Sequence, residues 1–197
     1  RSLLEVEKLP VALSEEALAL YFTLRYVPDP GSILAPIRKL EPGMALQVFR
    51  DGRVQQERYY AFVLDQDQEV KPEQLGQYVE QVEAALAGSL TDRLNSDVPL
   101  GMFLSSGVDS SLACAILTRK LGQKVKTFSV GFGDDPGSEH EAARDIARTL
   151  GTEHHDYIFG AADFERICEN IGNLLDEPNG DRSCVPTFLL SEFTRKD

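Results

Sequence analysis

Residues 99–111 read PLGMFLSSGVDSS, and this stretch decides the fold of the chain. An apolar run ends abruptly at small, hydroxyl-bearing residues, and apolar residues then recur at helical spacing over 112–117. The pattern predicts a strand, a tight turn and the start of a helix. Such a turn presents backbone N–H groups, several hydroxyls and one carboxylate at the positive end of a helix dipole. That arrangement suits a polyphosphate with its metal ion.

Strand and helix patterns alternate around this turn. Strands are expected at 99–104, 125–132 and 155–159, and helices at 109–121, 139–150 and 161–175. Gly122 and Gly151 follow two of these helices, where a left-handed residue commonly ends a helix. The alternation predicts an α/β fold, with a parallel sheet flanked by helices and with ligands at the carboxyl ends of the strands.

The first third of the chain predicts a helix and then a β-hairpin. Ser14 is a suitable N-cap for the helical pattern over 14–26. Residues 44–50 and 53–60 are expected to pair across an Asp-Gly turn.

A loss of periodicity at residues 61–72 marks the expected domain boundary. A long amphipathic helix then begins at Pro72 and ends near Asn95. We therefore expect one domain over 1–70 and a second over 71–197.

Composition excludes some classes of partner. The formal net charge is −12 with no Lys/Arg block, which argues against a nucleic-acid surface. No apolar run approaches the roughly 20 residues that span a membrane. The three cysteines, Cys114, Cys168 and Cys184, lack C-x-x-C spacing, so we expect core thiols in a reducing, cytoplasmic compartment. The chain opens without an initiator Met or a signal peptide and stops inside an apparent helix, so a piece of a longer protein is expected.

The central turn matches neither familiar phosphate loop. It lacks the Gly-Lys-Ser/Thr of a P-loop and the G-x-G-x-x-G of a dinucleotide site. Residues 105–110, SSGVDS, resemble instead the S-G-G-x-D-S pyrophosphate loop of ATP pyrophosphatases that adenylate an acceptor. The plain alternative is a serine-rich N-cap on an ordinary β-α turn.

The resemblance implies a role for each residue of the turn. Ser105, Ser110 and the backbone amides would hold pyrophosphate oxygens, and Asp109 would bind Mg²⁺. Ser106 departs from the pattern because it takes the place of the first glycine, whereas Gly107 is retained. A serine there is strained if the position needs a positive φ, and otherwise adds a hydroxyl donor.

Motifs along the whole chain resemble glutamine-dependent asparagine synthetase. They are YVPDP at 26–30, IRKLEPG at 37–43, TFSVGF at 127–132, the segment 141–155, and the block 176–191. The fold implied is the adenine-nucleotide α-hydrolase-like synthetase domain, preceded by a β-hairpin-containing remnant of an N-terminal nucleophile glutaminase domain. Nucleotide contacts implied by the resemblance are Leu104, Ser105, Ser106, Gly107, Asp109, Ser110 and Val130, the last through its backbone to adenine.

The family resemblance also implies the chemistry of the parent protein. ATP with Mg²⁺ would adenylate aspartate, ammonia from glutamine would displace AMP, and pyrophosphate would be released. The glutaminase nucleophile, an N-terminal cysteine, is absent from this sequence, no catalytic residue is assigned within it, and the full-length enzyme is expected as a homodimer. Two alternatives stay open: a nucleotide-binding or structural fragment without catalysis, and an enzyme that closes β-lactam rings by the same adenylation.

Other acidic and histidine residues have competing interpretations. His154 and His155 are adjacent on a strand and so point to opposite faces, which favours packing or capping over metal binding. The carboxylates at 134–135 are expected to be solvated in a Gly/Pro-rich loop. Three carboxylates follow the end of a helix, and we expect them either to line the active cleft or to cap a helix end. They are Asp176, Glu177 and Asp181.

Overall fold

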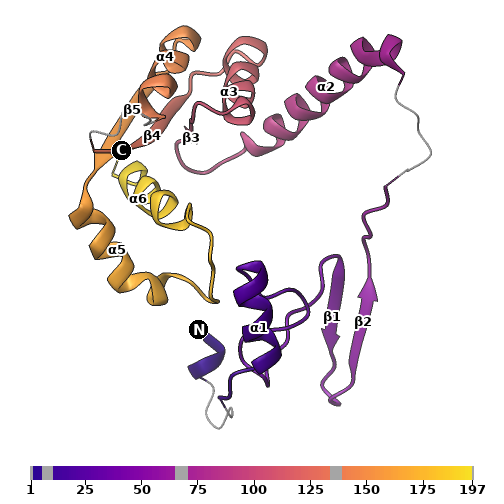
Figure 1. The fold of residues 1–197 in the computed structure, drawn as a ribbon. Helices are drawn as coiled ribbons and strands as arrows, with labels where there is room; N and C mark the ends of the chain where they lie inside the picture. The colour runs from indigo at the N-terminus through magenta and orange to yellow at the C-terminus, as the bar shows by residue number, and fades with distance from the viewer. Residues whose placement is uncertain (1, 6–10, 65–70, 134–138, 197) are drawn as a thin grey trace. The chain divides into compact units, whose positions relative to one another are not determined.

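The computed structural model describes residues 2–5, 11–64, 71–133 and 139–196 (Figure 1). Two compact units divide the chain. One comprises Arg1–Gln68 with Glu169–Arg182, and the other comprises Glu69–Cys168 with Ser183–Asp197. The carboxylates at 134–135 fall outside the described residues.

The first unit contains the expected helix and hairpin. Its elements are the 3₁₀ helix η1 (Ser2–Glu5), α1 (Glu15–Leu24), β1 (Met44–Val48) and β2 (Val54–Arg58). Ser14 caps α1 by accepting a hydrogen bond from the N–H of Ala17 at 3.2 Å, as predicted. The hairpin strands pair antiparallel from Met44↔Arg58 to Val48↔Val54, which confirms the hairpin.

Lys39 joins distant segments of this first unit. Its ammonium donates to the carbonyl of Val27 at 2.6 Å and to the carboxylate of Glu177 at 2.8 Å, and lies 3.5 Å from Asp29. Burial by itself lowers the pKa of Lys39, but Glu177 and Asp29 together raise it. Glu177, expected to line a cleft or to cap, therefore serves as the partner of a lysine.

The second unit is an α/β layer structure. Its elements follow in order: the 3₁₀ helix η2 (Pro72–Gln74), α2 (Leu75–Arg93), β3 (Gly101–Phe103), α3 (Val108–Ala115), the π-helix η3 (Ile116–Lys120), β4 (Lys126–Phe132), α4 (His140–Leu150), β5 (Glu153–Phe159) and α6 (Cys184–Thr194). Helix α5 (Ala161–Leu174) begins in this unit and ends in the other. The strand order is β3-β4-β5, and both pairs are parallel, which confirms the predicted fold class.

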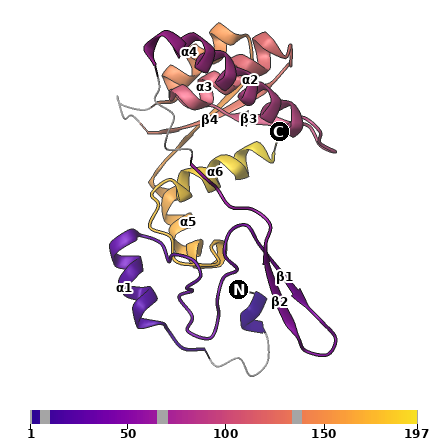
Figure 2. The ribbon, with the colours of Figure 1, turned by 90° about the vertical axis from the view of Figure 1, so that its right-hand side faces the viewer.

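Alternate residues of the sheet pack against different helices. On one face Phe128 stacks on His155 and meets the ring of Phe193 from α6 edge-on. On the other face Leu104 joins Cys114 of α3 and two alanines of α4 in a buried apolar cluster. Figure 2 shows α6 on one side of the strands and α3 and α4 on the other.

A close approach within the sheet requires a glycine at its edge. A Cβ added to Gly101 would lie 2.6 Å from the ring of Phe128 on the neighbouring strand. The glycine therefore allows this buried ring to lie across β3.

Several element bounds differ from the sequence-based expectation, and two of these differences have a physical cause in the structure. The helix expected over 109–121 changes to a π-helix at Ile116, so the N–H of Leu121 donates to the carbonyl of Ile116. The hydroxyl of Thr118 donates a hydrogen bond to the carbonyl of Cys114 at 2.9 Å. This bond competes with the regular helical bond from the N–H of Thr118 to the same carbonyl. The last strand begins at Glu153 rather than at His155, because its parallel pairing with β4 starts at Lys126.

The two expected terminating glycines have the predicted conformation. Gly122 has φ of 63° and Gly151 has φ of 69°, so both adopt the left-handed geometry that ends a helix.

Only one of the three cysteines is a core thiol. Cys114 is fully buried, and burial raises the pKa of its thiol, whereas Cys184 is half-buried and Cys168 is exposed. The prediction of a core position is wrong for Cys168. The apolar face of α5 is set by Ile167, and the next residue along a helix points about 100° away from that face.

None of the helices among the described residues is long and apolar enough to cross a membrane. The described residues also hold no cluster of three or more His, Cys, Asp or Glu side chains that could bind a metal ion by themselves.

A chain of polar side chains lies buried on the α4 side of the sheet. The hydroxyls of Thr152 and Thr127 are 2.8 Å apart, and Thr127 lies 3.0 Å from Nδ1 of His154. Nε2 of the same imidazole lies 3.2 Å from the hydroxyl of Ser129. His154 and His155 thus point to opposite faces and serve in packing, as predicted.

We expect His154 to make the stability of this unit depend on pH. Burial, more than any neighbouring charge, lowers the pKa of His154 below its ordinary value of 6.5. The folded state therefore favours neutral imidazole, and unfolding takes up a proton once the pH falls below 6.5. The free energy of unfolding should be level above pH 7 and should decrease between pH 6.5 and 5, as measured by urea denaturation.

Two substitutions test this assignment. His154→Gln, which can still hydrogen-bond but cannot titrate, should flatten the slope between pH 6.5 and 5, whereas His155→Gln should retain it. An unchanged slope in His154→Gln would assign the dependence to another group.

Candidate functional site

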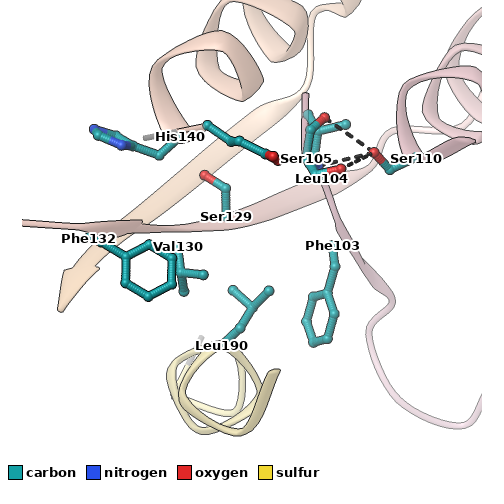
Figure 3. A pocket seen from close by; sticks show the side chains of 10 residues that line it. Phe103, Leu104, Ser105, Ser110, Ser129, Val130, Phe132, His140 and Leu190 are labelled. Atoms are coloured by element: carbon teal, nitrogen blue, oxygen red, sulfur yellow. Dashed lines mark hydrogen bonds between the residues drawn. The ribbon is translucent and has the colours of Figure 1, made fainter. Parts of the chain in front are cut away.

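A cavity of about 560 Å³ lies at the carboxyl ends of β3 and β4 (Figure 3). The central turn forms one wall, the end of β4 forms another, and α6 contributes a leucine. The residues that line it are Phe103, Leu104, Ser105, Ser110, Ser129, Val130, Phe132, Glu139, His140 and Leu190. This is the edge of the sheet where a parallel α/β fold is expected to bind its ligand.

Hydrogen bonds between two serines hold the turn. The hydroxyls of Ser105 and Ser110 are 2.8 Å apart, and the Ser110 hydroxyl also accepts from the N–H of Ser105 at 3.1 Å. The N–H of Gly107 donates to the Ser105 hydroxyl at 3.2 Å. Figure 3 shows both hydroxyls at one end of the cavity. The turn is therefore ordered by its own side chains and presents its hydroxyls as a pair.

The serine at position 106 is accommodated without backbone strain. Arg25 is the one non-glycine residue of the described chain with a positive φ, so Ser106 does not adopt the left-handed region. Gly107 has φ of −67° and ψ of 152°, an extended N-cap geometry that any residue can adopt. Ser106 can therefore take the place of the first glycine of the pair. A Cβ added to Gly107 would lie 3.2 Å from the hydroxyl of Ser105, so this glycine chiefly leaves room for that side chain.

Helix α3 begins directly after this loop. The first helical bond runs from the N–H of Ser111 to the carbonyl of Gly107, and Gly107 provides no side chain that caps the earlier amides. These N–H groups add their partial positive charge to the serine hydroxyls. The combination can hold an anion.

Strand β4 exposes main-chain groups to the cavity at Val130. Strand β3 pairs with β4 only as far as Phe128, whose carbonyl accepts from the N–H of Leu104 at 2.8 Å. Alternate residues of a strand direct their N–H and C=O to the same edge, so the groups of Val130 point to the side on which β3 has ended. One donor and one acceptor therefore face the cavity, which is the pair that the edge of an adenine ring can satisfy.

The structure brings together only part of the expected site. Leu104, Ser105, Ser110 and Val130 line the cavity, while Gly107 and Asp109 lie outside its lining. Ser106 lines a separate groove between α3 and α4. Asp109 is the second residue of α3, and its carboxylate is exposed.

Several lining residues carried no signal in the sequence. Leu190 comes from α6 and reaches the cavity only because α6 packs on β4. Ser129 is 3% exposed and is held by His154, so its position depends on a contact between two strands. Glu139 and His140 begin α4 next to β4, and only their position after a strand could have indicated them.

The electrostatics of the cavity are set by hydroxyls and amides rather than by cations. None of its described lining residues is a lysine or an arginine. Asp109 supplies one exposed carboxylate at the mouth of the turn, and Mg²⁺ usually takes one or two carboxylates together with phosphate oxygens and water. The residues present therefore fit a magnesium ion that arrives with its polyphosphate.

Comparisons with known proteins agree with this geometry. Residues 81–197 match the family described as asparagine synthase. The chain is 29% identical over its full length to glutamine-hydrolysing asparagine synthetase 1 of Bacillus subtilis, covering 30% of that protein. Over 93% of the chain it is 33% identical to a putative asparagine synthetase of Methanocaldococcus jannaschii, covering 35% of it. A third relative, from Bos taurus, is 31% identical over 53% of the chain.

The chain spans about a third of the length of the first two of these relatives. The family match covers the turn, the cavity and all three strands of the sheet, and the longer similarities extend into the hairpin unit. The chain belongs to the asparagine synthase family.

Proposed function

We propose that the full-length protein is a glutamine-dependent asparagine synthetase and that residues 71–197 carry the ATP-binding half of its synthetase site. Residues 1–70 would then be the end of the glutaminase domain. The observation that carries the proposal is the cavity, in which the Ser105–Ser110 pair and the open main chain of Val130 lie on adjoining walls. Phosphates at the first and adenine at the second are the two ends of one nucleotide.

The chemistry follows from this placement of ATP. A carboxylate oxygen of aspartate attacks the α-phosphorus, the bond from that phosphorus to the bridging oxygen breaks, and pyrophosphate leaves. Ammonia then attacks the activated carbonyl carbon, loses a proton, and displaces AMP to leave the amide. Negative charge grows on the pyrophosphate in the first step, where serine hydroxyls and free helix amides are already in place to stabilise it.

Each residue of the turn has a role in this proposal. The hydroxyls of Ser105 and Ser110 and the amides that begin α3 hold pyrophosphate oxygens, and Asp109 holds Mg²⁺ at the outer end. The magnesium ion, when bound, neutralises phosphate charge. Leu104 contributes main chain beside the nucleotide, since its own side chain belongs to the buried cluster with Cys114.

The rest of the reaction belongs to the remainder of a family-length protein. We propose that glutamine hydrolysis and the pocket for the aspartate acceptor are supplied there. We also propose a cytoplasmic location, because the three cysteines are free thiols in the structure.

The first test is the exchange of labelled pyrophosphate into ATP by the full-length protein. Reversible adenylation of aspartate requires exchange that appears only when aspartate is present. Exchange that is absent, or that proceeds equally without aspartate, would overturn the assignment. A β-lactam-forming enzyme would instead require its own carboxylate substrate.

Asp109→Ala should impair the use of Mg-ATP while leaving the fold intact. We expect kcat/KM for ATP to fall by about 100-fold, the order found when one charge-stabilising group is removed from an active site. The concentration of Mg²⁺ needed for half-maximal exchange should rise. Asp92→Ala, at an exposed site on α2, is the matched control and should behave as wild type. Unchanged exchange in Asp109→Ala would refute its role as a metal ligand.

Ser110→Ala should weaken both the turn and the site. It removes the hydroxyl that accepts from the N–H of Ser105 and contacts its Oγ, so we expect a loss of about 1 kcal/mol in the free energy of unfolding. The KM for ATP in the exchange assay should rise as well. Ser111→Ala is the control, because that hydroxyl bonds the Gly107 carbonyl and does not line the cavity. An equal rise in KM for both variants would contradict a specific role for Ser110.

A further inference from the structure

Glu139 brings a carboxylate to the wall of the nucleotide cavity. It is the one acidic residue among the described residues that line the cavity. Glu139 is the N-cap residue of α4, yet its side chain makes no hydrogen bond that caps the helix. An ionised carboxylate accepts hydrogen bonds and donates none, so its partners in a ligand are hydroxyl or amino groups, or a metal ion.

The other groups of the cavity restrict which part of a nucleotide this carboxylate can bind. Phosphates are placed at the Ser105–Ser110 pair, and a second negative charge next to them is repelled in the absence of a cation. The adenine edge is placed at the main chain of Val130, where a donor and an acceptor are already available. The part of ATP that joins these two ends is the ribose, whose 2′ and 3′ hydroxyls both donate.

The position of Ser129 supports the assignment of the ribose to the middle of the cavity, between the phosphates and the adenine. Figure 3 shows its side chain between the Ser105–Ser110 pair and Val130, at the level where the sugar would lie. Its hydroxyl is oriented by Nε2 of His154 at 3.2 Å and is almost wholly buried. It can therefore make at most a short contact with the sugar, and the one carboxylate among the described residues that line the cavity is that of Glu139.

We infer that the Glu139 carboxylate binds the ribose hydroxyls of the nucleotide and so makes the site selective for ribonucleotides over deoxyribonucleotides. This inference rests on the proposed function, since it assumes that ATP occupies the cavity. Glu139 is a binding residue in this account.

The test is equilibrium binding of ATP, 2′-deoxyATP and 3′-deoxyATP to the full-length enzyme with Mg²⁺, measured by calorimetry. Wild type should bind ATP about 10- to 100-fold more tightly than at least one deoxy analogue, the range for one hydrogen bond to a charged group. Glu139→Ala should lose this preference, because ATP binding weakens while binding of that analogue stays unchanged.

Glu141→Ala is the matched control. Glu141 is also an acidic residue in the first turn of α4, but it is exposed and does not line the cavity. This variant should keep the wild-type preference. Thermal unfolding midpoints equal to wild type would show that both variants are folded.

Three outcomes would overturn the inference. Equal weakening of ATP and both analogues in Glu139→Ala would mean that the carboxylate does not contact the ribose. Recovery of ATP binding by Glu139→Ala at raised Mg²⁺ would make Glu139 a metal ligand instead. Failure of the wild-type protein to bind ATP at all would overturn the proposed function, and this inference with it.

Discussion

The cavity depends on a difference in length between two neighbouring strands. Strand β3 stops pairing at Phe103, while β4 continues to Phe132 and stays paired with β5 along its whole length. Among the described residues, the main chain of Val130 therefore has no strand partner on the β3 side. The chain leaving β3 turns through the paired serines directly into α3, so that the hydroxyl-bearing residues Ser105 and Ser110 line the cavity beside the start of this helix. A longer β3 would pair with Val130 and close the site.

Three hydrogen-bonded polar side chains of the sheet affect both the stability of this unit and the wall of the cavity. Thr127, His154 and Ser129 form a hydrogen-bonded series across β4 and β5, and its last member reaches the cavity wall. Buried polar groups are tolerated when each has a partner, and the series satisfies this condition among the described residues. A neutral His154 thus serves both the packing of the sheet and the orientation of a hydroxyl at the cavity wall.

Asp109 and Glu139 illustrate how one charge type acquires two roles. Asp109 is exposed on the first turn of α3, outside the cavity lining, where a magnesium ion could meet the outer phosphates. Glu139 lines the cavity at the start of another helix. In both proposals the carboxylate lies at the start of a helix. We propose that the first carboxylate binds a metal ion and the second binds the sugar.

Sequence patterns alone predicted the strand, turn and helix around residues 99–111, the alternation that makes a parallel sheet, and the hairpin of the other unit. These follow from local spacing, capping and turn residues, whose physics extends over a few neighbours. Tertiary contacts, in contrast, set the end of β3 before Val130, bring Leu190 and Glu139 to the cavity, and leave Cys168 exposed. Each of these depends on packing between segments far apart in the chain, which no local pattern of residues encodes.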